Sequence, residues 1–292
     1  MIIDSHAHYA HPRFAGEPPV LWTEDGQWSV RSMEREALFD AMKAQGLLGA
    51  IEPSIGIEQL EAQMALVDAH PGFLWAAVGA HPTRCIHTPW EARKTLPAYL
   101  EKTNVVAVGE TGLDYHYPRR EQHRWRQKRW FRYQLRLAEQ YGLPVVLHVR
   151  LAHRDALRIL KHFRGRIVGG VAHCFTGDAR QAEDYIALGF AIGIGGALLH
   201  DDPRGQLLQD AVRQIPLKSI LVETDAPFVL PAVEDLSCSR KTRRKLCNSS
   251  DILPKVIERI AELKGESTAR VEQVIYQNTV RIFSLPSKEE TV

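Results

Sequence analysis

The segment "DSHAH", Asp4 to His8, places two imidazoles one residue apart directly after a short apolar run. In a β-strand, residues i and i+2 project to the same face, so His6 and His8 would point together. Two neutral imidazoles aimed at one point are what a shared metal ion requires. An isolated His-x-His also fits one core histidine and one surface histidine, so the other strands must decide between these interpretations.

Polar residues interrupt several further apolar runs at their C-terminal ends. The runs "VVAVGETGLD", "PVVLHVR", "GGVAHCF" and "ILVETDAPF" contribute Glu110 and Asp114, His148 and Arg150, His173, and Glu223 and Asp225. An ionisable group inside an apolar run costs several kcal/mol unless it is paired or metal-bound, and packing does not explain five such strands. The four histidines, together with two of these carboxylates, supply enough nitrogen and oxygen ligands for two divalent ions that share a bridging carboxylate. A mononuclear site is the alternative.

The elements that must position these side chains alternate between short apolar runs and amphipathic stretches. Strands are predicted at Ile2–His8, Leu47–Pro53, Phe73–Ala80, Val105–Glu110, Val145–Arg150, Gly170–Phe175, Phe190–Ile194 and Ile220–Asp225. Helical patterns cover 33–46, 124–142 and 154–163, and the first two close on glycines that are typical of helix C-caps. Eight strands, each leading to a helix or loop, predict one α/β domain, a (β/α)8 TIM barrel over 1–292 with a core to about 285 and a tail at 286–292. An open doubly wound sheet is the alternative.

Two long segments, 9–31 and 231–250, interrupt the alternation and are predicted to be loops because they are rich in Pro, Gly and charge. Both follow strand C-termini, where the active sites of barrel enzymes lie. The second contains "SRKTRRK", with Arg240, Arg243 and Arg244. Such a run usually forms a solvated loop, but beside the last strand it could instead attract a polyanion.

Composition narrows the class of protein. The 292 residues are 45% hydrophobic and 25% charged, as in ordinary globular proteins, and the net charge of +2 is too small to imply nucleic-acid binding by itself. The four cysteines are widely spread without a CxxC pair, which favours reduced thiols. The sequence shows no long apolar run, at its N-terminus or elsewhere. We therefore expect a cytoplasmic protein with no membrane association and no obligate protein partner.

The ordered motifs "DSHAH", "GAHP", "VGETGLDYH", "PVVLHVR", "AHCFTG" and "VETDAPF" resemble those of the TatD-type metal-dependent deoxyribonucleases, which have amidohydrolase-like barrels. The resemblance runs from Met1 to about Leu285, where "QNTVRIFSL" is similar to the family's closing helix. It implies that one metal is held by His6, His8 and Asp225, that the other is held by His148 and His173, and that Glu110 bridges them.

The sequence departs from this family in three places. The loop after His8 is longer, the family's Asn-Glu-Pro-like turn is replaced by Asn248-Ser249-Ser250, and the basic segment Arg240–Lys245 is not part of the pattern. None of these departures changes a residue of the implied ligand set. They bear on the choice of substrate.

Several residues around the ligand set have two interpretations. His81 could contact a substrate phosphate or only a loop carbonyl. Arg150 should face the same side as His148 and is expected to pair with Glu223 or to contact phosphate. Asp114 could orient a histidine or cap a turn. Surface positions are expected for His11, His87, His116, His153, His162 and His200, whereas Trp125 or Trp130 should pack against the barrel.

These observations predict a hydrolase in which two divalent ions (Zn, Mg, Mn, Co or Ni) activate water against a phosphodiester, with DNA as the expected substrate. Asp225 is the expected proton acceptor as well as a ligand. A duplex fits poorly into a barrel mouth, so single-stranded or frayed ends, and therefore exonuclease action, are expected. The same ligands would also serve a hydrolase of amides, lactones, small phosphoesters or a tRNA-linked ester, or a non-catalytic metal-binding scaffold.

Overall fold

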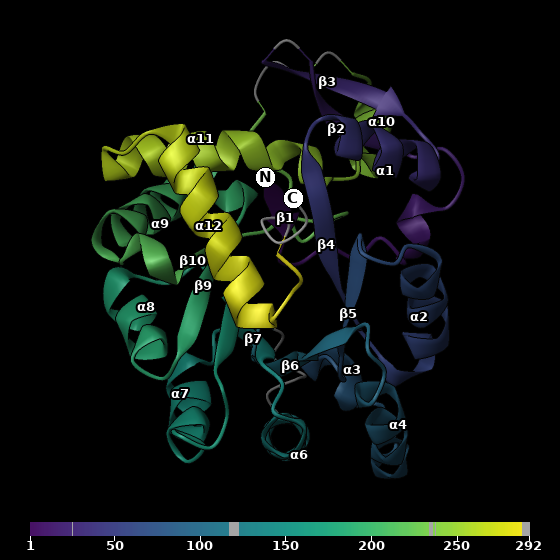
Figure 1. The fold of residues 1–292 in the computed structure, drawn as a ribbon, viewed down its shortest axis with the longest axis vertical. Helices are drawn as coiled ribbons and strands as arrows, with labels where there is room; N and C mark the ends of the chain where they lie inside the picture. The colour runs from purple at the N-terminus through teal and green to yellow at the C-terminus, as the bar shows by residue number, and fades with distance from the viewer. Residues whose placement is uncertain (25, 117–122, 234–235, 237, 288–292) are drawn as a thin grey trace.

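A computed structural model describes the chain except residues 25, 117–122, 234–235, 237 and 288–292 (Figure 1). Most of the predicted tail at 286–292 lies outside the described residues. The strands are β1 (Ile2–Asp4), β2 (Pro19–Glu24), β3 (Gln27–Ser32), β4 (Leu47–Pro53), β5 (Leu74–Val78), β6 (Val105–Asp114), β7 (Val145–Arg150), β8 (Gly170–His173), β9 (Phe190–Ile194) and β10 (Ile220–Val222). The helices are α1 (Arg35–Ala44), α2 (Leu60–Ala69), α3 (Pro82–Cys85), α4 (Leu96–Leu100), α6 (Arg124–Tyr141), α7 (His153–Lys161), α8 (Ala179–Ile186), α9 (Pro203–Gln214), α10 (Arg240–Lys245), α11 (Leu253–Lys264) and α12 (Thr268–Phe283).

Eight parallel strands form one sheet in the order β1-β4-β5-β6-β7-β8-β9-β10. Backbone bonds then join the two ends of the sheet. Ser5 N donates to Val222 O at 3.0 Å, and Ala7 forms an isolated parallel bridge with Ala226. The sheet is therefore a nearly closed TIM barrel, which confirms the predicted architecture and excludes the open doubly wound alternative.

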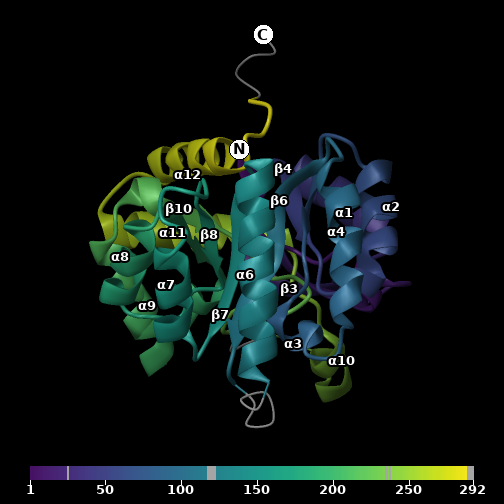
Figure 2. The same cartoon turned by 90° about the horizontal axis from the view of Figure 1, so that it is seen from below.

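The barrel interior contains one apolar side chain from each strand. This layer consists of Ile3, Ile51, Ala77, Ala107, Val146, Val171, Ala191 and Leu221. Tyr276 and Phe283 of α12 belong to the same buried cluster, so α12 covers one end of the barrel. Figure 2 shows α12 at the opposite end of the barrel from α3 and α10.

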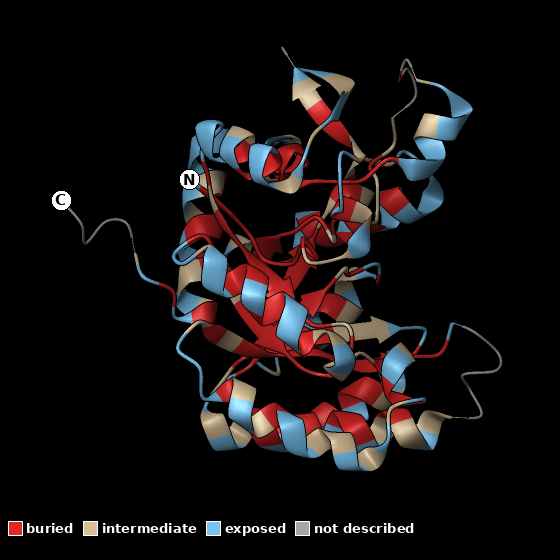
Figure 3. Ribbon diagram, turned by 90° about the vertical axis from the view of Figure 1, so that its right-hand side faces the viewer, coloured by how far each residue is buried: buried red, intermediate tan, exposed pale blue. Residues whose placement is uncertain are grey.

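A second, larger buried cluster fills the space between the sheet and the outer helices. Figure 3 shows the buried strands at the centre and helices whose outer faces are exposed. The helix ends follow the sequence signals, because Gly46 comes directly after the C-cap of α1 and Gly142 caps α6 in the left-handed conformation at φ 64°. Among the described residues, no helix combines the length and apolar character needed to cross a bilayer.

The two long segments are not plain loops, which corrects the sequence prediction. Within 9–31, β2 and β3 form an antiparallel hairpin, and within 231–250 the basic run forms the short helix α10. The segments also pair with each other, since Leu21 N donates to Cys247 O and Cys247 N donates to Pro19 O, both at 2.8 Å. The two segments therefore form one structural unit, in which Val20, Leu21 and Trp22 of β2 are buried.

Candidate metal centre

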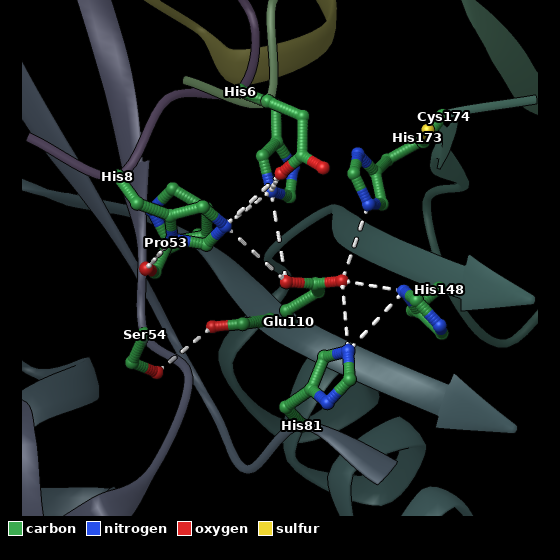
Figure 4. A network of polar contacts seen from close by, with 12 residues as sticks. His6, His8, Pro53, Ser54, His81, Glu110, His148, His173 and Cys174 are labelled. Carbon is green, nitrogen blue, oxygen red and sulfur yellow. Dashed lines mark hydrogen bonds and ion pairs between the residues drawn. The ribbon is translucent and has the colours of Figure 1, made fainter. Parts of the chain in front are cut away.

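All six predicted ligands converge at the C-terminal end of the barrel strands. Figure 4 shows His6, His8, Glu110, His148 and His173 pointing toward one another. For two of these ligands the period of two along a strand explains the position. Counting two residues on from the interior layer leads from Val146 to His148 and from Val171 to His173, and in the same way from Leu221 to Glu223. His148, His173 and Glu223 are therefore the next inward positions after the apolar layer on their strands.

Glu110 lies at the centre of the group, on an irregularity in β6. The register of β6 against β7 passes from Val108↔Val145 to Thr111↔Leu147, which leaves one extra residue in β6. Such bulges redirect side chains and are common beside active sites. The predicted strand ended at Glu110, whereas β6 continues to Asp114.

The two carboxylate oxygens of Glu110 face two different groups of histidines. Oε2 lies 3.6 Å from His6 Nε2 and 3.8 Å from His8 Nε2. Oε1 lies 2.7 Å from His148 Nδ1 and 3.2 Å from His173 Nε2. One carboxylate thus stands between two clusters of nitrogen ligands, and it is 3% exposed.

The first of these clusters lies on the seam that closes the barrel. His6 and His8 follow the end of β1 at Asp4, so they belong to the seam rather than to the strand itself. Asp225 N donates to His6 O at 2.9 Å, and His8 N donates to Ala226 O at 2.7 Å. Asp225, in the left-handed region at φ 54°, brings Oδ1 to 3.3 Å from His8 Nε2 and 3.6 Å from His6 Nε2.

The ring orientations fit metal ligation. His8 Nδ1 donates to Pro53 O at 3.1 Å, His173 Nδ1 lies 3.2 Å from Glu223 Oε1, and His148 Nε2 lies 3.3 Å from Asp114 Oδ2. In each case the other ring nitrogen faces the centre, as in metal sites where an acceptor fixes the tautomer of the ligand. His6 Nε2 and His8 Nε2 lie 3.0 Å apart, a spacing that suits a shared cation.

Among the described residues, three sets of possible ligand atoms lie within 4.8 Å of one another. They are His6, Glu110 and His173; His6, His8 and Asp225; and His81, Glu110 and His148. This donor set of imidazole and carboxylate suits Zn and the other divalent ions expected from the sequence.

Burial and charge act in opposite directions on these groups. Burial raises the pKa of Glu110, but the surrounding histidines, above all His81 and His173, outweigh it and hold the pKa well below its usual value. Burial lowers the pKa of His173, but Glu110 and Glu223 outweigh it and raise that pKa well above its usual value. The pKa of His6 is well below its usual value because of burial and the neighbouring His173.

His81 and Asp114 both contact the centre. His81 Nε2 lies 3.3 Å from Glu110 Oε1 and 3.2 Å from His148 Nδ1, while its Nδ1 accepts from Thr83 N and caps α3. Asp114 combines its two predicted roles, because Oδ2 faces His148 and Oδ1 accepts from His116 N at 2.9 Å. The histidine and that backbone bond counteract burial and lower the pKa of Asp114 to about 2.

The predicted pairing of Arg150 with Glu223 is wrong. Glu223 is 1% exposed and its Oε1 faces His173 and accepts from Cys174 N, whereas the Arg150 side chain is exposed. β7 ends at Arg150 and the chain turns at Leu151, with φ 54°, so the guanidinium reaches water.

Two buried carboxylates that the sequence reasoning missed support the site. Asp4 accepts from His6 N at 3.0 Å, Thr224 Oγ1 at 2.6 Å and Ser250 Oγ at 2.7 Å, which ties the first and last strands together. Glu52 accepts from Tyr9 N at 2.6 Å in the loop after His8. Burial raises the pKa of each to about 7. Glu52 had the same signal as the other strands, an acid at the end of an apolar run.

A cavity of about 520 Å³ opens over the centre and forms the mouth of the barrel. Besides the metal-site residues, its walls include Arg84, Phe228, His11 and His87. The last two were expected to be ordinary surface histidines. They line the mouth because the loops after β1 and β5 fold over it, a placement for which the sequence carries no local signal.

The predicted polyanion contacts Arg240, Arg243 and Arg244 are all exposed on α10. Arg243 Nη2 donates to Val233 O, which ties α10 to the segment that follows β10. Figure 1 shows α10 beside the β2–β3 hairpin. None of these arginines lines the mouth itself.

A family model described as TatD related DNase matches residues 3–284. The chain is 32% identical over 255 residues to the 3'-5' ssDNA/RNA exonuclease TatD of Rahnella sp. (strain Y9602), covering 87% of this chain and 94% of that protein. It is 34% identical over 254 residues to the protein of the same name from Pantoea vagans (strain C9-1), covering 86% and 94%. The crystal structure of YJJV, a TatD homologue from Escherichia coli K12, superimposes with a TM-score of 0.79 at 29% identity and covers 98% of both chains. This chain is therefore a member of the TatD-related DNase family.

Proposed function

We propose that this protein is an exonuclease that removes nucleotides from single-stranded DNA or RNA with the help of two divalent ions. The observation that carries the proposal is the division of the Glu110 carboxylate between two histidine groups, with Oε2 toward His6 and His8 and Oε1 toward His148 and His173. The relatives named 3'-5' ssDNA/RNA exonucleases support the substrate class and the 3′ end as the starting point.

Each side chain has a role in this proposal. One ion would be held by His6, His8 and Asp225, the other by His148 and His173, and Glu110 would join them. When bound, such ions lower the pKa of water and neutralise the charge of a phosphodiester. Asp225 Oδ1 would accept the proton of the attacking water, since its side chain is 18% exposed and faces the mouth.

The mouth favours a strand end over a duplex. Its volume of about 520 Å³ lies within the range of small-ligand pockets, roughly 300–1,000 Å³, and its walls reach the buried carboxylate. Arg84 and His81 line it and would face the phosphate and sugar of the terminal nucleotide.

The test combines metal analysis and a substrate panel. We expect about two equivalents of divalent metal per chain and stepwise shortening of 5′-labelled single strands, with little activity on lactones. Glu110→Gln should lose both metal and activity, because an amide presents only one oxygen. A protein that binds metal and hydrolyses lactones, but no nucleic acid, would refute the proposed substrate. One equivalent of metal in a fully active protein would refute the paired site.

A further inference from the structure

Trp125 differs from the other tryptophans of the chain. It lies in the first turn of α6 and is 61% exposed, whereas the other five are buried or half-buried. The sequence predicted that Trp125 or Trp130 would pack against the barrel, and Trp130, 2% exposed, is the one that does. One exposed apolar residue needs no special explanation, so its surroundings decide whether it has a role.

Arg126, the next residue along the chain, connects Trp125 to the segment beside the barrel mouth. The Arg126 guanidinium lies 5.8 Å from the centroid of the Trp125 ring, and its Nη2 donates to Thr88 O at 3.1 Å. Arg126 is half-buried and held by this bond. Thr88 follows α3, so the start of α6 is fastened to the segment beyond the mouth.

A groove of about 360 Å³ runs over this segment. Thr88 lines it together with Ile57, Arg84 and His87, and the last two also line the mouth. The groove therefore shares a wall with the cavity over the metal centre, and Arg126 contacts it at Thr88. Figure 2 shows α6 extending along the barrel to the level of α3.

The chemistry of this surface suits a single nucleic-acid strand. An exposed indole offers a face on which any base can stack, and arginines attract the phosphates. Arg84 lies in the groove wall, Arg126 donates to the lining residue Thr88, and Glu58 is the carboxylate in the lining. The rest of the lining is mainly apolar, which suits sugars and bases.

We propose that the groove, Arg126 and Trp125, together called the α6 track, hold the part of a single strand that extends out of the mouth, with one base stacked on Trp125. The inference rests on the proposed exonuclease function and adds to it the course of the strand. It differs from the contact expected at α10, since α6 and α10 lie toward opposite ends of the molecule in Figure 1.

The test is a length series with the metal-loaded enzyme, from bis(p-nitrophenyl) phosphate through oligothymidylates of about 2 to 20 nucleotides. Trp125→Ala should raise KM for the long oligonucleotides roughly 5- to 150-fold, the value of one stacked base. kcat should stay within about twofold, and KM for the shortest substrates should not change. Trp125→Phe should restore most of the affinity. The length at which the effect begins measures how far along the strand Trp125 lies.

A control and a second readout separate the possible failures. Val168→Ala changes an exposed apolar residue, 65% exposed, ahead of β8 and therefore at the end of the barrel opposite the mouth, and should have no effect at any length. In binding experiments, oligothymidylate should quench tryptophan fluorescence in the wild type and much less in Trp125→Phe. If the wild type cleaves oligonucleotides but Trp125→Ala has the same KM at every length, the α6 track is refuted and the proposed function stands. If no nucleic acid is cleaved, the fluorescence experiment still tests the α6 track. The track is refuted if oligothymidylate does not quench the wild type, or if it quenches Trp125→Phe as strongly as the wild type.

Discussion

Gly193 is the residue through which the support of His173 can be tested without touching a proposed ligand. It lies on the inward face of β9, where a Cβ would lie 2.6 Å from Glu223 Cδ and 2.9 Å from Glu223 Oε1. Ordinary contacts begin at 3.4 Å, so in Gly193→Ala the buried carboxylate must shift by about 0.8 Å or more. That shift moves Oε1 away from His173 Nδ1 and Cys174 N, the two groups it contacts.

Two consequences follow from this displacement. Overpacking typically costs about 1–3 kcal/mol, and weakening a hydrogen bond to a buried charged group adds about 1–2 kcal/mol, so we expect a loss of roughly 2–5 kcal/mol in unfolding free energy. Loss of the group that orients a ligating histidine usually lowers metal affinity about 10- to 100-fold. The affinity at the site of His148 and His173 should therefore fall, with less change at the other site.

The assay is a metal titration by calorimetry alongside chemical denaturation of the metal-free protein. Ile192→Val is the matched control, because Ile192 lies in the same strand but in the cluster between sheet and helices. It should cost about 0.5–1.5 kcal/mol of stability and leave metal affinity unchanged. If Gly193→Ala loses stability but binds both metals as tightly as the wild type, Glu223 does not position His173 and the reasoning is wrong.

Three further predictions concern other parts of the molecule. Asp225→Asn should lower kcat about 10²–10⁴-fold while metal analysis still finds most of the metal, since the amide keeps an oxygen but cannot accept the proton; near-normal kcat in excess metal would assign the proton to another group. Arg243→Ala with Arg244→Ala should raise KM for long DNA and flatten its dependence on salt, with kcat largely unchanged; an unchanged salt slope would remove α10 from the substrate path. Burial raises the pKa of Asp251, which accepts from Thr23 N, from 3.8 to about 6. Protonated Asp251 therefore stabilises the folded state. This stabilisation is fully present below about pH 4 and is lost as the pH rises through about 6, which lowers the free energy of unfolding by up to about 3 kcal/mol. Asp251→Asn should flatten this part of the curve of unfolding free energy against pH, and a curve identical to wild type would contradict the assignment.

The barrel, and the positions of His148 and His173 in the ligand set, were predictable because they follow from a period of two. The strands read as apolar runs, and the residues that break them at one end are the ones that converge. His148 and His173 lie two positions beyond interior residues, which any alternating pattern would place together. The resemblance to the TatD family added the assignment of ligands to two metals.

What the sequence did not predict depends on long-range contacts. The extra residue in β6 that turns Glu110 to the centre arises from the pairing of β6 with β7, which no local pattern encodes. The hairpin in 9–31 was hidden by its Pro, Gly and charged residues, although "DG" between Glu24 and Gln27 is a hairpin signal. The prediction for Arg150 failed because β7 ends at this residue and the chain turns at Leu151, which leaves the side chain exposed.

The position of the closing seam links metal binding to folding. His6, His8 and Asp225 directly follow the first and last strands, and the bonds that bring them together are the same bonds that close the barrel, such as Asp225 N to His6 O. His148 and His173 come from neighbouring strands in the middle of the sheet, whose pairing is complete without closure. An ion at the seam would therefore hold the two ends of the sheet together. An ion held by His148 and His173 would mainly replace protons on those two imidazoles. Glu110 contacts both groups, and the ring of His6 stacks on the ring of His173 with centroids 3.6 Å apart. Occupancy of the seam and the state of the central strands can therefore affect each other through this carboxylate and this ring contact.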